Sequence, residues 1–303
     1  MKGHLLCIPC TLRAAYDIAT KATDNEDLHR RVLAETLTWL TNTDSLLNVP
    51  PTMLHTYVFR LVQRITGNND PFAKLKVESN RVAMRLISIL ENEIKGKPLA
   101  ETFRLAVLGA ICGNSIDFEV EGYQMSLDDL EKSLISCFRS GLALDDTNML
   151  MEALSRSSKV LYLLDNAGEI AFDKLLMKTI SKMYPIKIYA AVKSGPVMND
   201  ATMDDALQVG LNDVAEVITT GSTSIGLNLE ECSPEFMRHL EEAEVIIAKG
   251  QGYYESLTEI EGILKKPIIY MLRAKCSAVA RTLNVSKGAN VVKAANFGQL
   301  RQE

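Results

Sequence analysis

The sequence lacks both an excess of positive charge and any long apolar run. Its 303 residues carry a formal net charge of −5, so a nucleic-acid partner has no electrostatic support. No apolar run approaches the roughly 18 residues needed to cross a bilayer, and polar residues interrupt the amino-terminal segment too often for a signal peptide. We therefore expect a cytoplasmic protein that binds neither nucleic acid nor a membrane.

Closely spaced cysteines are scarce. Of the six cysteines, only Cys7 and Cys10 stand near each other, and the second close pair that a zinc ribbon needs is missing. In a chain of this size without a secretion signal we expect no disulfide framework. Three interpretations of the Cys7–Cys10 pair remain open: a redox pair, two metal ligands completed by other side chains, or buried thiols at the start of a helix.

Glycine-rich nucleotide-binding motifs are absent as well. A dinucleotide-binding loop has three spaced glycines after a strand, whereas the segment DNAGEI at 165–170 has one. The later KGQG turn lacks the third glycine because Glu255 stands at that position, and there is no Walker A motif. We expect no dinucleotide cofactor.

Helical periodicity dominates from Thr11 to about Arg156. Apolar residues recur at helical spacing, and a glycine ends one of the segments. We expect helices over Leu28–Asn42, Leu54–Gly67, Asn80–Lys95, Leu99–Ile111, Leu127–Ser140 and Thr147–Arg156. Two loops are predicted to interrupt them, one over Asn69–Asn80 and one over Gly113–Asp117, where Gly113 would form a left-handed helix cap. Residues 1–156 are thus predicted to form a helical module.

Short runs rich in Val and Ile follow, at spacings typical of βαβ units. The predicted strands are Val160–Leu164, Ile186–Val192, Glu216–Thr219, Val245–Ala248, Ile268–Leu272 and Asn290–Val292. They are apolar enough to be buried on both faces, which favours a mostly parallel sheet between helices. The predicted fold class is α/β, with a Rossmann-like domain over residues 157–303 that follows the amino-terminal helical module.

Polar side chains gather where these strands end. The carboxyl ends of parallel strands line one crevice, so side chains far apart in sequence can meet there. Oxygen ligands indicate a divalent cation, and lysines with exposed amides indicate an anion site. The candidate residues at the strand ends are Asp165, Asn166, Glu169, Lys193, Asn199, Asp200, Lys249, Gly250, Gly252 and Lys275. Alternatively, Asp165 is a helix cap, and Lys249 and Lys275 are solvated surface residues.

The loop over Gly113–Asp117 has two interpretations. Asn114 and Asp117 either stabilise a cap and a turn or close the crevice from the helical side. In the second case these two side chains, with the lysines of Asp70–Asn80, would contact the part of the substrate that extends away from the anion site.

Several segments resemble a known family. LLDNAGEIAFDKLL, KSGPVMNDATMDD, AKGQGYYESL and MLRAKCSAVAR resemble, in this order, blocks of the damage-control phosphatases, domain-of-unknown-function family 89. CIPC, DPFAKLKVESN and GNSID resemble its archaeal branch with a paired cysteine. One departure is visible: many relatives have an Asn-aromatic pair after Gly-Gln-Gly, where this chain has Tyr253 and Tyr254.

The resemblance implies a metal-dependent phosphatase with a helical amino-terminal part packed on an α/β domain. Its metal ligands would be Asp165, Asn166 and Asp200, holding Mn²⁺, Ni²⁺, Co²⁺ or Mg²⁺. Lys275 would bind the phosphate. The expected substrates are small phosphorylated metabolites such as sugar phosphates.

We expect direct hydrolysis assisted by the metal, with attack by Asp165 on phosphorus as the alternative route. Two other functions remain open. One is an S-adenosylmethionine-dependent carboxyl methyltransferase, for which no cofactor-binding loop is visible. The other is a non-enzymatic metal- or redox-sensing module. The sequence indicates no oligomeric state.

Overall fold

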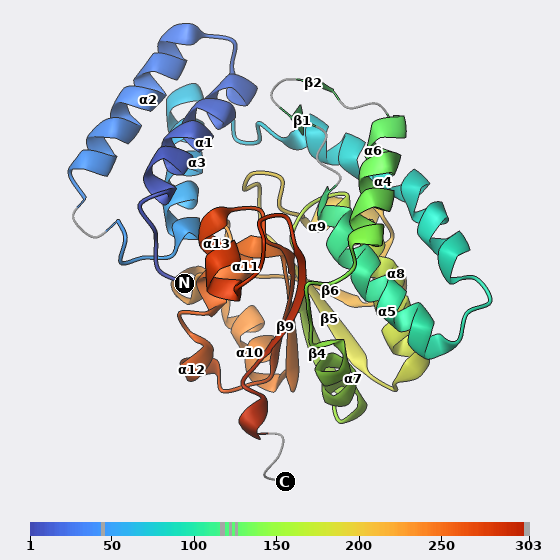
Figure 1. Cartoon of the computed structure of the whole chain (residues 1–303). Coiled ribbons are helices and arrows are strands. Elements are labelled where there is room, and N and C mark those ends of the chain that lie inside the picture. The colour runs from blue at the N-terminus through green and yellow to red at the C-terminus, as the bar shows by residue number, and fades with distance from the viewer. Residues whose placement is uncertain (44–45, 116–118, 121–122, 125–126, 300–303) are drawn as a thin grey trace.

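A seven-stranded sheet forms the centre of the protein in the computed structural model (Figure 1), which describes residues 1–43, 46–115, 119–120, 123–124 and 127–299. The strands lie in the order β3-β9-β8-β7-β4-β5-β6. Their bounds are β3 (Leu144–Asp145), β4 (Lys159–Leu163), β5 (Lys187–Val192), β6 (Glu216–Thr219), β7 (Val245–Lys249), β8 (Ile268–Arg273) and β9 (Asn290–Ala295). A separate antiparallel pair is formed by β1 (Glu119–Val120) and β2 (Tyr123–Gln124).

The predicted α/β fold with a mostly parallel sheet is confirmed. Strands β4 to β8 pair in parallel. The exception is β9, which runs antiparallel to β8 over six residue pairs and carries β3 at its outer edge. The edge strand β3 was not predicted, because two residues are too few to show a strand pattern.

Helices cover both faces of the sheet. The helices of the first part are α1 (Cys7–Ala22), α2 (Glu26–Thr41), α3 (Pro51–Thr66), α4 (Ala73–Ile94), α5 (Leu99–Cys112) and α6 (Leu127–Ser140). Those of the second part are α7 (Thr147–Ser155), α8 (Glu169–Met183), α9 (Met203–Gln208), α10 (Pro234–Glu242), α11 (Gly250–Leu257), α12 (Glu261–Leu264) and α13 (Ser277–Leu283).

Alternate residues of the central strands enter two different cores. In β4, Val160 and Tyr162 pack with α4, α5 and α8, whereas Leu161 and Leu163 pack with α10, α11 and α13. The strands are therefore apolar on both faces, as parallel strands between two helical layers must be. The division of the chain at residues 156 and 157 remains a prediction. The core that contains Val160 and Tyr162 includes side chains from both sides of that division.

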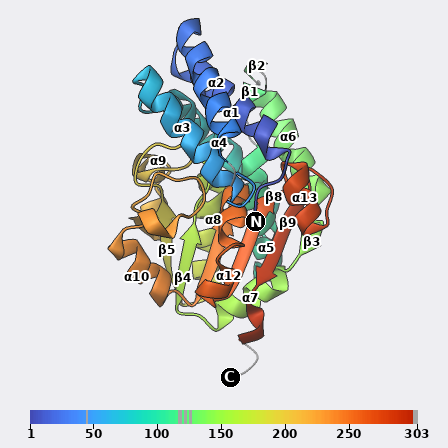
Figure 2. The ribbon, with the colours of Figure 1, turned by 90° about the vertical axis from the view of Figure 1, so that its left-hand side faces the viewer.

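Helices α1, α2 and α3 form a separate bundle at one end of the sheet (Figure 2). Their local signals are clear in the sequence. The Asn25 side chain accepts a hydrogen bond of 2.9 Å from the Asp27 amide at the start of α2, and Gly67 ends α3 with φ of 73°. The bundle matters for function because its side chains form one wall of the cavity described below.

Two local predictions in the first half are wrong. Residues 73–80 are not a loop but the first two turns of α4, which starts directly after the Asp70-Pro71 turn. Gly113 is not left-handed, since its φ is −53°. A side chain there would instead place a Cβ 2.8 Å from the Phe172 ring, so close packing of α5 against α8 explains the glycine.

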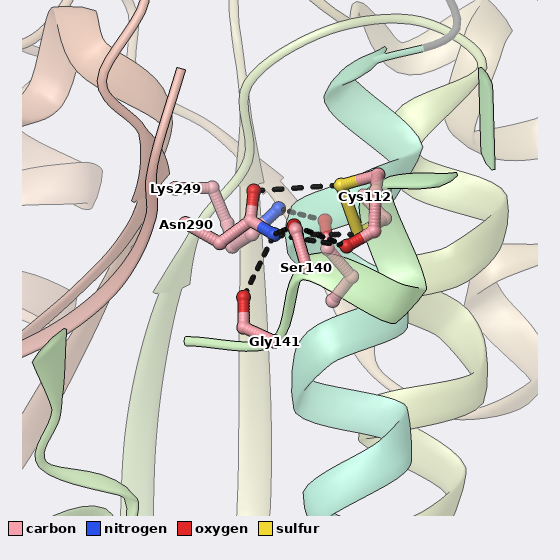
Figure 3. Close-up of a disulfide and its surroundings, with 7 residues drawn as sticks. Cys112, Ser140, Gly141, Lys249 and Asn290 are labelled. Atoms are coloured by element: carbon pink, nitrogen blue, oxygen red, sulfur yellow. Dashed lines mark hydrogen bonds between the residues drawn. A yellow bond between two sulfur atoms is a disulfide. The ribbon is translucent and has the colours of Figure 1, made fainter. Parts of the chain in front are cut away.

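No disulfide framework was expected, yet the described residues contain a disulfide bond. Cys112, the last residue of α5, is bonded to Cys137 of α6 (Figure 3). The buried Asn290 side chain of β9 lies beside this bond and donates hydrogen bonds to the carbonyl oxygens of Gly141 and Cys137, at 3.0 and 3.2 Å. The disulfide therefore ties α5, and the Gly113–Ser115 turn (η1) that follows it, to α6.

Cys7 and Cys10 lie in the first turn of α1, where Cys7 is buried and Cys10 is exposed. Both thiols are free. Among the described residues, none of the helices combines the length and apolar character that a membrane span requires.

Candidate active site

Two loops at the carboxyl end of the sheet are joined by backbone hydrogen bonds. One follows β4 and contains Asp165 and Asn166, and the other lies between β5 and α9 and contains Asp200. The Ala201 amide donates to the Asp165 carbonyl at 2.8 Å, and the Ala167 amide donates to the Asn199 carbonyl at 2.9 Å. Asn166 and Asp200 thereby form an isolated antiparallel bridge. Residues 34 positions apart in sequence are held side by side.

The site lies where the strand order reverses. The chain runs outward from β4 to β5 and β6 and then returns to β7 on the other side of β4, so the order switches between β4 and β7, the position at which open α/β sheets form their crevice. Gly250, at the end of β7, faces Asp165 across this crevice. Its φ is +77°, and an added Cβ would lie only 1.9 Å from Asp165 Oδ2. A glycine is required here both by backbone conformation and by space.

Two side-chain amides hold the Asp165 carboxylate. Asn114 Nδ2 and Asn166 Nδ2 each donate to Asp165 Oδ2 at 2.8 Å. Burial raises the pKa of the Asp165 carboxyl well above its ordinary value, and repulsion from Glu169 and Asp200 raises it further. This crowding of negative charge would be relieved by a bound cation.

Asp200 is fixed from below by a buried lysine. The Lys193 ammonium, 1% exposed, lies 3.6 Å from Asp200 Oδ2, donates to the Tyr253 hydroxyl at 3.1 Å and to the Gly226 carbonyl. Burial raises the pKa of Asp200 to about 6, although Lys193 lowers it. Tyr253, the residue after Gly-Gln-Gly, therefore has a polar role in this chain, because its hydroxyl accepts a hydrogen bond from Lys193.

A second buried lysine neutralises Glu169. The Lys249 ammonium is fully buried and contacts Glu169 Oε1, Asp173 Oδ1 at 3.0 Å and the Ala110 carbonyl at 2.9 Å. Glu169 also accepts a hydrogen bond of 2.5 Å from Asn114 Nδ2. Lys249 thus connects α5, α8 and β7 beneath the crevice, and its charge is shared by two carboxylates.

The residues present fit a divalent cation. Asp165, Asn166 and Asp200 offer two carboxylates and one amide oxygen, a set of hard ligands. The buried Asn114 Oδ1 has no hydrogen-bond partner among the described residues. In the described ranges, no three His, Cys, Asp or Glu side chains form a metal-ligand group. A cation here would consequently rely on the Asn166 amide and on water as well as on the two carboxylates.

A cavity of about 790 Å³ opens above these residues. Asn166, Asn199 and the exposed Lys275 line it on the sheet side. The opposite wall comes mainly from the α1–α3 bundle and the start of α4: Arg13, Ala14, Tyr16, Asp17, Ile18, Thr20, Lys21, His55, Phe72 and Leu75. The cavity thus extends from Asn166, one of the candidate metal ligands, to the amino-terminal helices.

The structure brings together most of the residues predicted from sequence but distributes them over two levels. Asp165, Asn166, Asp200 and Gly250 meet at the crevice, and Lys275 stands at the cavity. Below them lie the ammonium groups of Lys193 and Lys249, both in contact with protein carboxylates. Asn114 and Glu169 are buried next to Asp165, and Gly252 follows Gly250 in the first turn of α11.

The predicted substrate contacts from the helical half are placed differently. Asp117 lies outside the described residues. Asn114 is buried and touches Asp165 and Glu169. The Lys76 ammonium is also buried and forms a 3.0 Å ion pair with Asp70.

Asn80 was missed as a site residue. It is fully buried, accepts a hydrogen bond of 2.6 Å from the Gly168 amide and donates to Asp205 Oδ1 at 2.9 Å. It therefore connects α4 with the turn that carries Asn166 and with α9. Its position at the end of a polar segment offered no signal, because the partners are 88 and 125 residues away.

Comparison with known proteins identifies relatives that cover nearly the whole chain. A Methanocaldococcus jannaschii protein named as uncharacterized is 40% identical over 288 residues, covering 94% of this chain and 93% of its own. A Pyrococcus horikoshii protein named damage-control phosphatase is 37% identical over 291 residues, covering 96% and 97%.

The crystal structure of a DUF89 family protein from Pyrococcus horikoshii superposes with a TM-score of 0.85 at 36% identity, over 96% of this chain and 98% of that one. The family described as the damage-control phosphatase ARMT1-like domain matches residues 4–291. The chain therefore belongs to the damage-control phosphatase ARMT1-like family.

Proposed function

We propose that this protein is a phosphatase that hydrolyses phosphomonoesters of small metabolites with a divalent cation as cofactor. The observation that carries the proposal is the convergence of Asp165, Asn166 and Asp200 at the carboxyl end of the sheet, next to a cavity that Asn166 and the exposed Lys275 line. The name of the Pyrococcus horikoshii relative supports the same activity. Mn²⁺, Ni²⁺, Co²⁺ and Mg²⁺ are the candidate ions, because the ligands are oxygens.

The cation, when bound, would polarise the phosphoryl oxygens and lower the pKa of a coordinated water. The protein's own part is to hold its ligands in place. The amides of Asn114 and Asn166 fix the Asp165 carboxylate, and Lys193 fixes that of Asp200. Lys249 offsets the charge of Glu169, so that the crevice does not carry three uncompensated carboxylates.

Lys275 is our candidate for phosphate binding. It is exposed, lines the cavity and lies close enough to Asp165 to lower the pKa of that carboxyl. The backbone amides of Gly250 and Gly252, at the start of α11, are further candidates because the first amides of a helix have no partner within it. Lys193 and Lys249 are better described as positioning residues, since their ammonium groups are engaged with protein carboxylates.

The cavity favours a small substrate. Its volume of about 790 Å³ accommodates a metabolite rather than a polymer, and the net charge of −5 offers a nucleic acid no attraction. Polar groups on its wall suit hydroxyl groups, and sugar phosphates remain the substrates that we propose.

The direct test is hydrolysis of p-nitrophenyl phosphate by purified protein with each of the four ions, before and after exhaustive chelation. We expect hydrolysis that chelation abolishes and added metal restores. Full activity after chelation and dialysis would contradict the proposed cofactor. Metal binding without hydrolysis of any phosphomonoester would favour a sensing module instead.

A further inference from the structure

One buried side chain of α4 contacts both segments that carry the candidate metal ligands. Asn80 Oδ1 accepts a hydrogen bond of 2.6 Å from the amide of Gly168, which follows Asn166 in the first loop. Asn80 Nδ2 donates at 2.9 Å to Asp205 Oδ1, at the start of the helix that follows Asp200. The two segments are thus connected through α4 as well as through their own backbone hydrogen bonds.

An asparagine is the residue type that these two partners require. The Gly168 amide, which precedes the first turn of α8, is a donor with no partner in its own helix, whereas the Asp205 carboxylate is an acceptor. The Asn80 amide offers an acceptor and two donor hydrogens, and Gln208 Oε1 also accepts from Nδ2, at 2.8 Å. An aspartate would oppose a second carboxylate, and a leucine would leave both buried partners without a hydrogen bond.

Helix α4 holds Asn80 at a fixed place. Val82 and Leu86, further along the helix, are anchored in the core. The helix backbone also packs directly against the first ligand loop, since a Cβ added at Gly168 would lie 3.1 Å from both the Cβ and the carbonyl oxygen of Ser79. A contact from a helix that is packed in the core positions its partner more precisely than a contact from another loop.

Asp205 passes the contact on to the segment that contains Asp200. Its Oδ2 atom accepts hydrogen bonds from the Thr202 amide at 2.9 Å and from the Thr202 hydroxyl at 2.7 Å, which form the capping box of α9. The buried Lys76 ammonium, one turn before Asn80 on α4, lies 3.9 Å from the same oxygen. Two side chains on one face of α4 thus reach a single carboxylate.

We propose that Asn80 is a positioning residue that sets the spacing between the two ligand-bearing segments and thereby the affinity of the site for its cation. The inference rests on the proposed metal-dependent function and deepens it, because it assigns the spacing of the ligands to a side chain outside both segments. Asn80 acts through Gly168 and Asp205 and is not itself a ligand.

Asn80→Leu and the exchange variant Asn80→Asp/Asp205→Asn test this role. The leucine fills a similar space but makes no hydrogen bond. The exchange variant reverses the hydrogen bond between positions 80 and 205, keeps an acceptor for the Gly168 amide and leaves the net charge unchanged. Thr56→Val is the matched control, because the buried Thr56 hydroxyl also accepts a hydrogen bond from a distant backbone amide, that of Ile225 at 3.0 Å, but lies on α3.

The measurement is calorimetric titration with Mn²⁺, Ni²⁺, Co²⁺ and Mg²⁺, compared for the ion that the parent binds most tightly. We expect Asn80→Leu to weaken its affinity roughly 10-fold or more, as is typical when the outer partners of metal ligands are removed. Turnover of p-nitrophenyl phosphate at saturating metal should stay within about threefold of the parent, since the ligands are unchanged. The exchange variant and Thr56→Val should bind the ion nearly as tightly as the parent. If urea unfolding shows that Asn80→Leu does not fold, Asn80→Ala takes its place in the same comparison.

Parent-like metal affinity in the folded Asn80 variant would overturn the role of Asn80 and leave the proposed phosphatase intact. Equal losses of affinity in this variant and in Thr56→Val would overturn it as well, and so would an exchange variant that binds the ion no better than Asn80→Leu. A parent protein that binds none of the four ions would instead refute the proposed function itself.

Discussion

Gly250→Ala should separate the geometry of the crevice from the stability of the fold. Gly250 has φ of +77°, a conformation that costs an alanine about 1–2 kcal/mol. Its new methyl group would also lie 1.9 Å from Asp165 Oδ2 and 2.2 Å from Asp165 Cγ. Both effects act at the same point, next to the first candidate metal ligand.

The size of the displacement follows from these distances. Cβ atoms essentially never approach another heavy atom within 3.0 Å, so the Asp165 carboxylate has to move by at least 1.1 Å, the difference from 1.9 Å. A misplacement of about 1 Å at a reacting centre can cost about 100-fold in rate. We expect a loss of that order in kcat/KM, weaker metal binding, and a decrease of about 1–2 kcal/mol in the free energy of unfolding.

The assays are hydrolysis of p-nitrophenyl phosphate, metal binding by calorimetry, and urea unfolding. Gly262→Ala is the control for a glycine-to-alanine change, because nothing lies within 4 Å of a Cβ there and its φ is not positive. Gly252→Ala tests the neighbouring turn position, where the closest atom would be 3.1 Å away. Normal metal binding and activity in Gly250→Ala would refute the close approach of β7 to Asp165.

Three further predictions concern groups around the site. Burial raises the pKa of Glu255 to about 7 from its usual 4.5, so the folded state loses stability as pH rises from 4.5 to 7. In urea unfolding, Glu255→Gln should therefore be more stable than the parent by up to about 3 kcal/mol at pH 8 and equally stable near pH 4.5. The same difference in unfolding free energy between variant and parent at both pH values would contradict this. Replacing Cys112 and Cys137 together by serine, 25 residues apart, should lower the free energy of unfolding by about 3.5 kcal/mol relative to the oxidised parent, and equal stability would show that the bond does not form. The double variant Cys7→Ser/Cys10→Ser should keep metal-dependent hydrolysis, whereas complete loss of bound metal in a folded variant would place this pair in a metal site.

The sheet could be predicted because its strands are short apolar runs bounded by turns at regular intervals. The same regularity placed Asp165, Asn166 and Asp200 together, since side chains after parallel strands share one edge. The resemblance to the family added the same three residues independently. What sequence could not show is how the two loops are joined, because those hydrogen bonds come from the backbone and leave no residue pattern.

The substrate side of the site was harder to predict. Asn114 was interpreted either as a residue that stabilises a cap and a turn or as one that closes the crevice from the helical side. It is buried and donates to Asp165, while the cavity opens toward His55 and α1. The disulfide was missed for a similar reason: Cys112 and Cys137 are far apart in sequence and belong to no motif. The Asn114–Asp165 contact and the disulfide both depend on tertiary packing rather than on local periodicity.

We propose that the residues joined across the two loops hold the cofactor of a phosphatase. Asp200→Asn keeps the shape of the side chain and an oxygen for Lys193 but removes the charge, whereas Asp204→Asn changes an exposed acid four residues further along the chain. The measurement is turnover of p-nitrophenyl phosphate per folded molecule at saturating metal. We predict that Asp200→Asn loses roughly 100-fold or more, since a bound metal contributes several kcal/mol, and that Asp204→Asn stays near the parent. Equal turnover in the two variants would contradict the account.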